Sequence, residues 1–262
     1  MRAGRGDRQT RLEVELRTLK LTIAYDGTEF VGWQRQAEGV SIQGLIEDAL
    51  AAFEGAPVTA HAAGRTDAGV HALGQVASVS INAGHDVQAF QRGLNAALPP
   101  AVRIVGVEEA EPGFHARFSA RSKAYEYRIV NAPFVSPFLY RFAWHVPAPL
   151  DVDAMRNASS CLIGTHDFAA FQGAGAMVSS TRRTISSLEW EAGGSYNRPL
   201  TFRVEGDGFL RHMVRNIVGT LVEVGAGRWP GSRVGEVLAS RDRRQAGTTA
   251  PALGLFLARV NY

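Results

Sequence analysis

The stretch AGRTDAGVHALGQV, residues 63–76, places the carboxylate of Asp67 in a short loop that Gly64 and Gly69 enclose. Glycine permits backbone conformations and a close approach of ligands that other residues forbid. Arg65, two positions before Asp67, carries a charge that would keep a carboxylate ionised and orient it. The pattern fits two interpretations: an Asx-type turn with a surface ion pair to Arg65, or an exposed, ionised nucleophile.

The segments around this loop predict a ferredoxin-like unit. Alternating apolar and polar residues predict strands, and apolar residues spaced three and four apart after the N-cap residue Ser41 predict a helix. The predicted elements are, in chain order, a strand at 19–25, a helix from Ser41, strands at 58–64 and 75–81, a helix at 86–98 and a strand at 102–110. The order β-α-β-β-α-β is that of the split βαβ fold.

The second half of the chain repeats this order loosely. Its predicted elements are a strand at 124–130, a helix at 151–164, strands at 183–192 and 200–206, a helix at 209–227, a shorter helix at 232–240 and a strand at 253–260. We therefore predict an α+β fold in which two ferredoxin-like halves merge into one mixed, mainly antiparallel sheet. Helices are expected on one face of this sheet and an RNA-binding groove on the other.

The chain is expected to divide into a leader and two halves. Residues 1–17 form a basic leader that we expect to be disordered, residues 18–112 form the N-terminal half with Asp67, and residues 113–262 form the C-terminal half. Residues 1–20 hold six of the 28 basic residues and three of the 25 acidic ones, so the remaining chain is balanced in charge. A surface that binds nucleic acid must then come from the arrangement of charges and not from their excess.

The composition excludes several classes of protein. No run of about 18 apolar residues could span a membrane, and the N-terminus lacks the apolar core of a secretory signal. The single cysteine, Cys161, excludes an internal disulfide and a cysteine-based zinc site, and suits a reducing cytoplasm. Motifs for nucleotide cofactors and histidine spacings typical of metal ligands are absent, so we expect neither a cofactor nor a metal.

Two further segments could contact a nucleic acid. Tyr125 and Tyr127 alternate along a predicted strand among basic residues, which is how many proteins stack a base beside a phosphate backbone; ordinary core packing is the alternative, and is favoured for one of the two. On the predicted helix at 209–227, Arg211, Arg215 and Asn216 would suit phosphate contacts, or form a solvated polar face.

Taken together, these segments resemble one family, the bacterial tRNA pseudouridine synthases of the A type. Those that carry the resemblance are YDGTEFVGWQRQ (25–36), AGRTDAGVHALGQV (63–76), NAALP (95–99), FHARFSARSKAYEYRI (114–129), THDFAAF (165–171), FLRHMVRNIVGTLVEVG (209–225) and LGLFLARVNY (253–262). The resemblance covers residues 19–262, and the 14-residue match around Asp67 is highly specific. The leader has no evident counterpart in the family.

The resemblance implies a cofactor-free isomerase that converts uridines 38, 39 and/or 40 of the tRNA anticodon stem-loop to pseudouridine. It implies that Asp67 is the nucleophile and that Tyr125 stacks on the target base. It also implies that Arg65 pairs with Asp67 and helps to displace the base, and that Leu255 lies at the pocket edge. Members of the family resemble one another in forming cytoplasmic homodimers that hold the tRNA across both subunits.

Two other functions remain as alternatives at this point. One is a tRNA-binding or tRNA-folding module without chemistry, which would not require a desolvated acid in a positive groove. The other is a nucleoside or glycoside hydrolase, which normally needs two carboxylates that flank the bond. The loop offers only Asp67, and Asp26, in YDGT, fits a turn better than a second catalytic acid.

Overall fold

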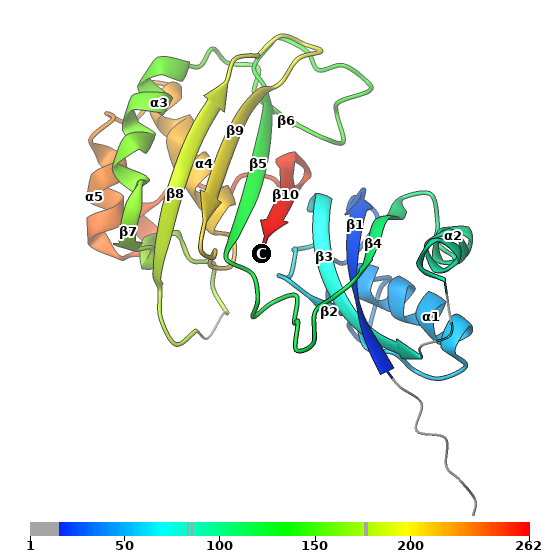
Figure 1. The fold of residues 1–262 in the computed structure, drawn as a ribbon. Helices are drawn as coiled ribbons and strands as arrows, with labels where there is room; N and C mark the ends of the chain where they lie inside the picture. Colours follow the sequence, from blue (N-terminus) through cyan, green and yellow to red (C-terminus); the bar gives the residue numbers. More distant parts are fainter. Residues whose placement is uncertain (1–15, 83, 85, 176–177) are drawn as a thin grey trace, which may run out of the picture.

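The computed structural model describes residues 16–82, 84, 86–175 and 178–262 (Figure 1). The strands are β1 (Leu16–Tyr25), β2 (His61–Ala62), β3 (His71–Asn82), β4 (Val102–Glu109), β5 (Ser122–Val130), β6 (Trp144–His145), β7 (Gly164–Asp167), β8 (Arg182–Glu191), β9 (Leu200–Gly206) and β10 (Leu255–Asn261). The α-helices are α1 (Ile42–Glu54), α2 (Val87–Ala97), α3 (Val152–Ser159), α4 (Met213–Gly225) and α5 (Arg233–Ser240). Residues 1–15 of the predicted leader lie outside the described residues, and Leu16 and Arg17 belong to β1.

All ten described strands form one mixed sheet, which confirms the predicted α+β class. The main path runs β4-β1-β3-β10-β5-β9-β8-β7, with β2 on β3 and β6 on β5. The first half therefore has the order β4-β1-β3-β2, and the second has the matching order β10-β5-β9-β8, with β7 added at its edge. This shared order is that of the ferredoxin-like unit, repeated as the sequence predicts.

The last strand of the chain joins the two halves. β10 pairs parallel to the start of β3, with Phe256 opposite His71, and antiparallel to the length of β5. The start of β3 is free for this pairing because β2 pairs only with Ala77 and Ser78, six and seven residues further along the strand. Figure 1 shows β10, in red, between β3 and β5 although it ends the chain. The predicted division of the chain after residue 112 falls in the β4–β5 loop and stays a prediction.

The placement of the groove differs from the prediction. On β5, Lys123 and Tyr125 share the face that packs on the core, while Glu126 lies on the opposite, polar face and pairs with Arg203 of β9. The cleft that Lys123 and Tyr125 line is also lined by Gln43 of α1 and by residues at the start of α4. It therefore opens on the helix-bearing face, between the helices of the two halves.

Helix α3 is shorter than the predicted helix at 151–164. It ends at Ser159, and a 3₁₀ turn and strand β7 follow. The hydroxyls of Ser159 and Ser160 donate hydrogen bonds to the carbonyl oxygens of Arg156 and Asn157, three residues back. Such local side-chain bonds compete with continued helix, and the apolar periodicity alone does not reveal them.

Candidate active site

Residues 63–70 form the Asp67 loop. Hydrogen bonds from side chains of β1 and β3 and from the backbone of Trp33 hold this loop in place. The hydroxyls of Tyr25 and Thr66 lie 2.7 Å apart, and Gln75 Nε2 donates to the Gly64 carbonyl oxygen at 2.7 Å. The Trp33 amide donates to the Thr66 carbonyl oxygen at 3.1 Å. Burial raises the pKa of Tyr25 to about 12, so this hydroxyl stays protonated at neutral pH. The sheet thus fixes the backbone on which Asp67 stands.

A second loop packs directly on the Asp67 loop. We call it the opening loop, residues 26–40. Gly32 of this loop has φ of +100°, and a Cβ there would lie 2.6 Å from the Thr66 carbonyl oxygen and 2.9 Å from the Asp67 carbonyl carbon. Glycine is therefore required at this position both for its backbone conformation and for the close approach of the two loops.

We expect Gly32→Ala to destabilise the fold by about 1–3 kcal/mol and to lower the turnover of the remaining folded protein, because the added methyl pushes on Thr66 and Asp67. Thermal unfolding and turnover per folded molecule measure the two effects. Gly55→Ala is the matched control, since Gly55 also has a positive φ of 67° but a Cβ there meets nothing within 4 Å. Equal turnover in the two variants would contradict the role assigned to Gly32.

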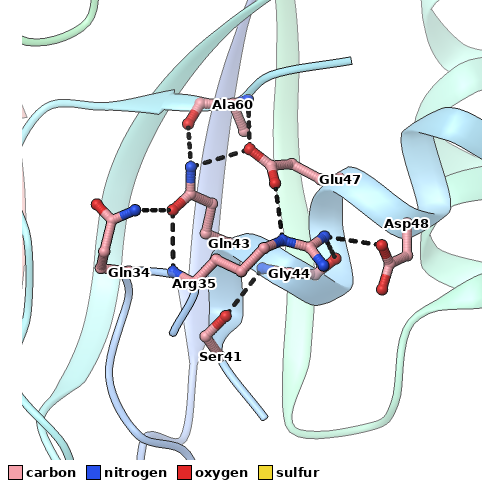
Figure 2. Close-up of polar contacts among 8 residues, drawn as sticks. All are labelled: Gln34, Arg35, Ser41, Gln43, Gly44, Glu47, Asp48 and Ala60. Atoms are coloured by element: carbon pink, nitrogen blue, oxygen red, sulfur yellow. Dashed lines mark hydrogen bonds and ion pairs between the residues drawn. The ribbon is translucent and has the colours of Figure 1, made fainter. Parts of the chain in front are cut away.

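The opening loop is in turn clamped to α1 (Figure 2). Gln43 Oε1 accepts hydrogen bonds from Gln34 Nε2 at 2.8 Å and from the Arg35 amide at 3.1 Å. The Arg35 guanidinium donates to Glu47 at 3.1 Å and to Asp48 at 2.7 Å. Because Gln34 and Gln43 also line the cleft, this network fixes the wall of the cleft that α1 provides.

Asp67 meets two basic side chains from the far half of the chain. Its Oδ2 lies 3.3 Å from Nη1 of Arg215 and 3.4 Å from Nε2 of His212. Arg215 is itself fixed, since its Nε donates to the Ala250 carbonyl oxygen at 2.8 Å. The Asp67 side chain is 31% exposed, so the carboxylate is both held and open to the cleft.

His212 occupies the last position before α4. It has φ of 60° in the left-handed region, and α4 begins at Met213. The predicted helix at 209–227 is therefore wrong at its start, and Arg211 does not share a helix face with Arg215. Burial lowers the pKa of His212; Asp67 opposes this effect, and the Arg215 and Arg211 charges add to it. The imidazole is therefore neutral at pH 7 and does not neutralise Asp67.

The prediction that Asn216 lies on a polar face of this helix is also wrong. This side chain is fully buried, its Nδ2 donates to the Phe171 carbonyl oxygen at 2.8 Å, and its Oδ1 accepts from Thr249 at 2.7 Å and from Arg243 at 3.1 Å. All of these bonds lie inside the protein, so the amide holds the segments around α4 together. A periodic pattern cannot distinguish a polar residue that faces water from one that is satisfied in the core.

Tyr125 and Leu255, which the family resemblance implies as site residues, both line the cleft. The cleft has a volume of 1260 Å³, and its lining residues include Tyr125, Leu255 and Asp67. Tyr125 is 8% exposed and makes an edge-to-face contact with Phe209, with ring centroids 5.0 Å apart. Tyr127, in contrast, is fully buried and donates to the Pro251 carbonyl oxygen at 2.7 Å. Of the two strand tyrosines, one faces the cleft and the other belongs to the core.

Arg65 lies at the cleft but apart from the carboxylate with which it was expected to pair. Its side chain is exposed and makes no hydrogen bond or ion pair within the described part of the chain. Arg215 makes the ion pair with Asp67 instead. The exposed side chain of Arg65 has no polar contact among the described residues that would hold it against Asp67, whereas Arg215 is anchored by α4 and the Ala250 carbonyl group.

The charge of the cleft is strongly uneven. Asp67 is the one carboxylate among its described lining residues. The basic side chains that line it are Arg65, Arg117, Lys123, Arg211 and Arg215. Because Arg215 alone of these pairs with Asp67, the other four leave a net positive cleft beside a single acid. Such a surface attracts a polyanion although residues 21–262 are balanced in charge.

Comparison with known proteins fits this arrangement. A family model for tRNA pseudouridine synthase matches residues 21–119 and 158–262. The chain belongs to the tRNA pseudouridine synthase family. It is 49% identical over 244 residues to tRNA pseudouridine synthase A of Myxococcus xanthus, across 93% of this chain and 91% of the relative. It is 45% identical over 247 residues to the protein of that name from Pelobacter propionicus, across 94% of this chain and the whole relative.

The family resemblance predicted from the sequence is thus confirmed, and tRNA pseudouridine synthases are isomerases. Among the described residues, no group of three or more histidine, cysteine, aspartate or glutamate side chains could hold a metal ion. None of the described helices is long and apolar enough to cross a membrane. In this tRNA pseudouridine synthase, His212 and Lys123 are cleft residues that sequence reasoning did not select as site residues. No local motif marks them, because their roles depend on contacts between distant segments.

Proposed function

We propose that this protein converts uridine to pseudouridine at positions 38, 39 and/or 40 of the tRNA anticodon stem-loop, with Asp67 as the nucleophile. The observation that carries the proposal is the isolation of Asp67: it is the one carboxylate among the described residues of a positive cleft, and Arg215 orients it. The names of the relatives supply tRNA as the substrate.

The reaction needs only groups that this cleft contains. A covalent attack by the Asp67 carboxylate assists cleavage of the bond between uracil N1 and ribose C1′. The detached uracil turns and its C5 bonds to C1′. The bond to Asp67 then breaks and regenerates the carboxylate, the hydrogen on C5 leaves as a proton, and N1 takes up a proton. Electrons and atoms balance without redox change or phosphate energy. Water must be excluded while the base is detached, because it would hydrolyse the separated base and sugar, and the apolar side chains of Tyr125, Phe209 and Leu255 in the cleft would serve this once the base is bound.

The remaining site residues have roles in holding the base. The target uridine must leave its stack before Asp67 can reach it, at a cost of a few kcal/mol. Stacking on Tyr125 offsets about 1–3 kcal/mol of that cost. Leu255 supplies an apolar edge of the pocket, and Arg65 helps to displace the base from the RNA. Arg211 is exposed at the cleft and suits a phosphate contact.

The two alternatives account less well for the site. A hydrolase of the usual kind uses two carboxylates on either side of the bond, and the described cleft offers one. Asp26 serves a turn: its Oδ1 accepts from the Thr28 amide at 3.0 Å and lies 3.2 Å from His71 Nδ1. A module that only binds RNA would not need a half-exposed acid held by a fixed arginine.

The test is release of tritium from tRNA labelled at uracil C5. Isomerisation expels the C5 hydrogen, whereas hydrolysis or binding alone retains it. We expect the wild-type protein to release tritium from tRNA with uridine at position 38, 39 or 40, and to release none when these three positions hold cytidine. No release from any tRNA by folded protein that binds RNA would refute the proposal.

We also propose a cytoplasmic homodimer, as the family resemblance implies. Support comes from a patch of exposed aromatic side chains at the β5–β6 loop and the β8–β9 hairpin: Phe134, Phe138, Tyr140 and Tyr196. Phe138 is 86% exposed, and Phe134 contacts Tyr196 with ring centroids 5.3 Å apart. Apolar groups gathered on a surface are typical of a contact between proteins.

We expect Phe138→Ser to shift the protein from dimer to monomer in sedimentation experiments, because it removes the most exposed ring of the patch. Phe118→Ser is the control, since Phe118 is also exposed, at 77%, but lies on the cleft. A wild-type protein that sediments as a monomer, or a Phe138→Ser variant that stays dimeric, would contradict this interface.

A further inference from the structure

Lys123 presents a positive charge to the cleft without a partner among the described residues. Within the described residues its ammonium group makes no hydrogen bond and no ion pair, although it is only partly exposed. Burial lowers the pKa of Lys123, and the charges of Arg117 and Arg183 lower it further. Arg117 also lines the cleft, and no carboxylate among the described residues pairs with Lys123, which is unfavourable unless an anion from outside pairs with it.

The position of Lys123 relates it to two parts of the active site. It stands two residues before Tyr125 on β5, so both side chains lie on the same face, about 7 Å apart along the strand. Its Nζ would lie 3.6 Å from a Cβ at Gly64, and so it rests against the loop that carries Asp67. An anion bound by Lys123 would therefore lie beside both the stacking ring and the nucleophile loop.

We propose that Lys123 binds the backbone phosphate next to the target uridine and so positions the displaced nucleotide on Tyr125 within reach of Asp67. This inference rests on the proposed function, because RNA is the polyanion concerned. The separation between Lys123 and Tyr125 is comparable to that between a base and the phosphates of its own nucleotide. Arg117, also on the cleft and without an ion pair in the described chain, would share the charge of the same phosphate.

The chain contains a matched control for this residue. Lys20 is the one other lysine in the sequence. Its ammonium lies 3.5 Å from Glu108 and over the ring of Tyr262, and it does not line the cleft. Lys123→Met and Lys20→Met thus remove the same charge and keep a side chain of similar length. Lys123→Arg keeps the charge at the cleft.

The first measurement is the salt dependence of binding to an anticodon stem-loop with a single target uridine. All variants are made in the Asp67→Asn protein so that the RNA is not converted. We expect Lys123→Met to weaken binding and to reduce the slope of log affinity against log salt by about one. We expect Lys20→Met to leave the slope unchanged and Lys123→Arg to restore most of it. Circular dichroism confirms that each variant is folded.

The second measurement identifies the phosphate. Two stem-loops each carry one neutral methylphosphonate, on the 5′ or the 3′ side of the target uridine. If Lys123 binds one of these phosphates, the RNA with that phosphate neutralised binds the protein that retains Lys123 more weakly than the unmodified RNA does. The Lys123→Met substitution then causes no further loss of affinity for that RNA, because the contact is already gone. A full and additive loss for both RNAs, or an unchanged salt slope in Lys123→Met, would overturn the inference.

These results are independent of whether the protein isomerises uridine. Failure of the proposed function would show as tritium retained by tRNA incubated with the wild-type protein. Failure of the inference about Lys123 would show as unchanged binding in Lys123→Met while wild-type tritium release is normal.

Discussion

Asp67→Asn is expected to abolish release of C5 tritium from tRNA, with a loss of turnover of at least about 10⁴-fold. The substitution keeps the size and shape of the side chain but replaces a nucleophilic oxygen anion with a neutral amide. It also removes the charge that Arg215 contacts at 3.3 Å. Binding of tRNA should survive or become tighter, because the one carboxylate in the described cleft is then neutral.

Single-turnover tritium release and a filter-binding isotherm measure these two properties on the same preparation. Asp153→Asn is the matched control: its carboxylate is 82% exposed, lies on α3 and pairs with Arg156 three residues along the helix. It should leave both turnover and binding unchanged. Normal tritium release by folded Asp67→Asn would rule out the nucleophile role, whereas loss of RNA binding together with turnover would indicate that the aspartate serves the shape of the cleft.

The element order was predictable from the sequence because its signals are local. Ser41 caps α1 through its side-chain oxygen, which accepts from the Gly44 amide, and the turn between Asp67 and Val70 requires the positive φ of Gly69. The repeat of β-α-β-β-α-β then followed from the spacing of apolar residues. The resemblance to one family singled out Asp67 in residues 63–76, Tyr125 in residues 114–129 and Leu255 in residues 253–262, and the structure brings all three to one cleft.

The contacts across the cleft were not predictable in this way. Asp67 and Arg215 are 148 residues apart, and no residue near either one signals the other. The start of α4 was misplaced because His212 adopts a left-handed conformation that its residue type does not announce. Asn216 was assigned to a polar face because helical periodicity does not show which polar groups find partners in the core.

The sheet face of the groove was misjudged for a related reason. The order of predicted elements puts the helices on one face of the sheet, and the groove was expected on the other; that order does not show where the helices leave their own face uncovered. In the structure the polar face carries ion pairs such as Glu126–Arg203 and Glu205–Arg259. The cleft residues Lys123 and Tyr125 instead share the core-facing side of β5, at the point where the helices of the two halves leave the sheet uncovered.

Arg215→Gln should lower turnover by about 10²–10³-fold, the second largest effect that we expect. The guanidinium is held at Nε by the Ala250 carbonyl oxygen and presents Nη1 to Asp67, so it fixes both the direction and the charge environment of the Asp67 carboxylate. Arg215→Lys should recover only part of this loss, because a single ammonium group cannot reproduce the fork that contacts both partners. Affinity for tRNA should change far less than turnover.

The pH profile separates this positioning role from a structural one. Burial lowers the pKa of His212, and the charge of Arg215 is one of the groups that lower it further. In the wild-type protein the imidazole of His212 becomes protonated only below its ordinary pKa of 6.5. The protonated ring then forms an ion pair with Asp67, which makes the Asp67 carboxylate less nucleophilic. Removal of the Arg215 charge raises the pKa of His212, so the loss of activity on acidification should begin at a higher pH in Arg215→Gln. When His212→Gln is added to Arg215→Gln, the loss of activity should no longer begin at a higher pH. An unchanged pH profile, with turnover lost only in proportion to RNA binding, would make Arg215 a phosphate contact and not the residue that orients Asp67.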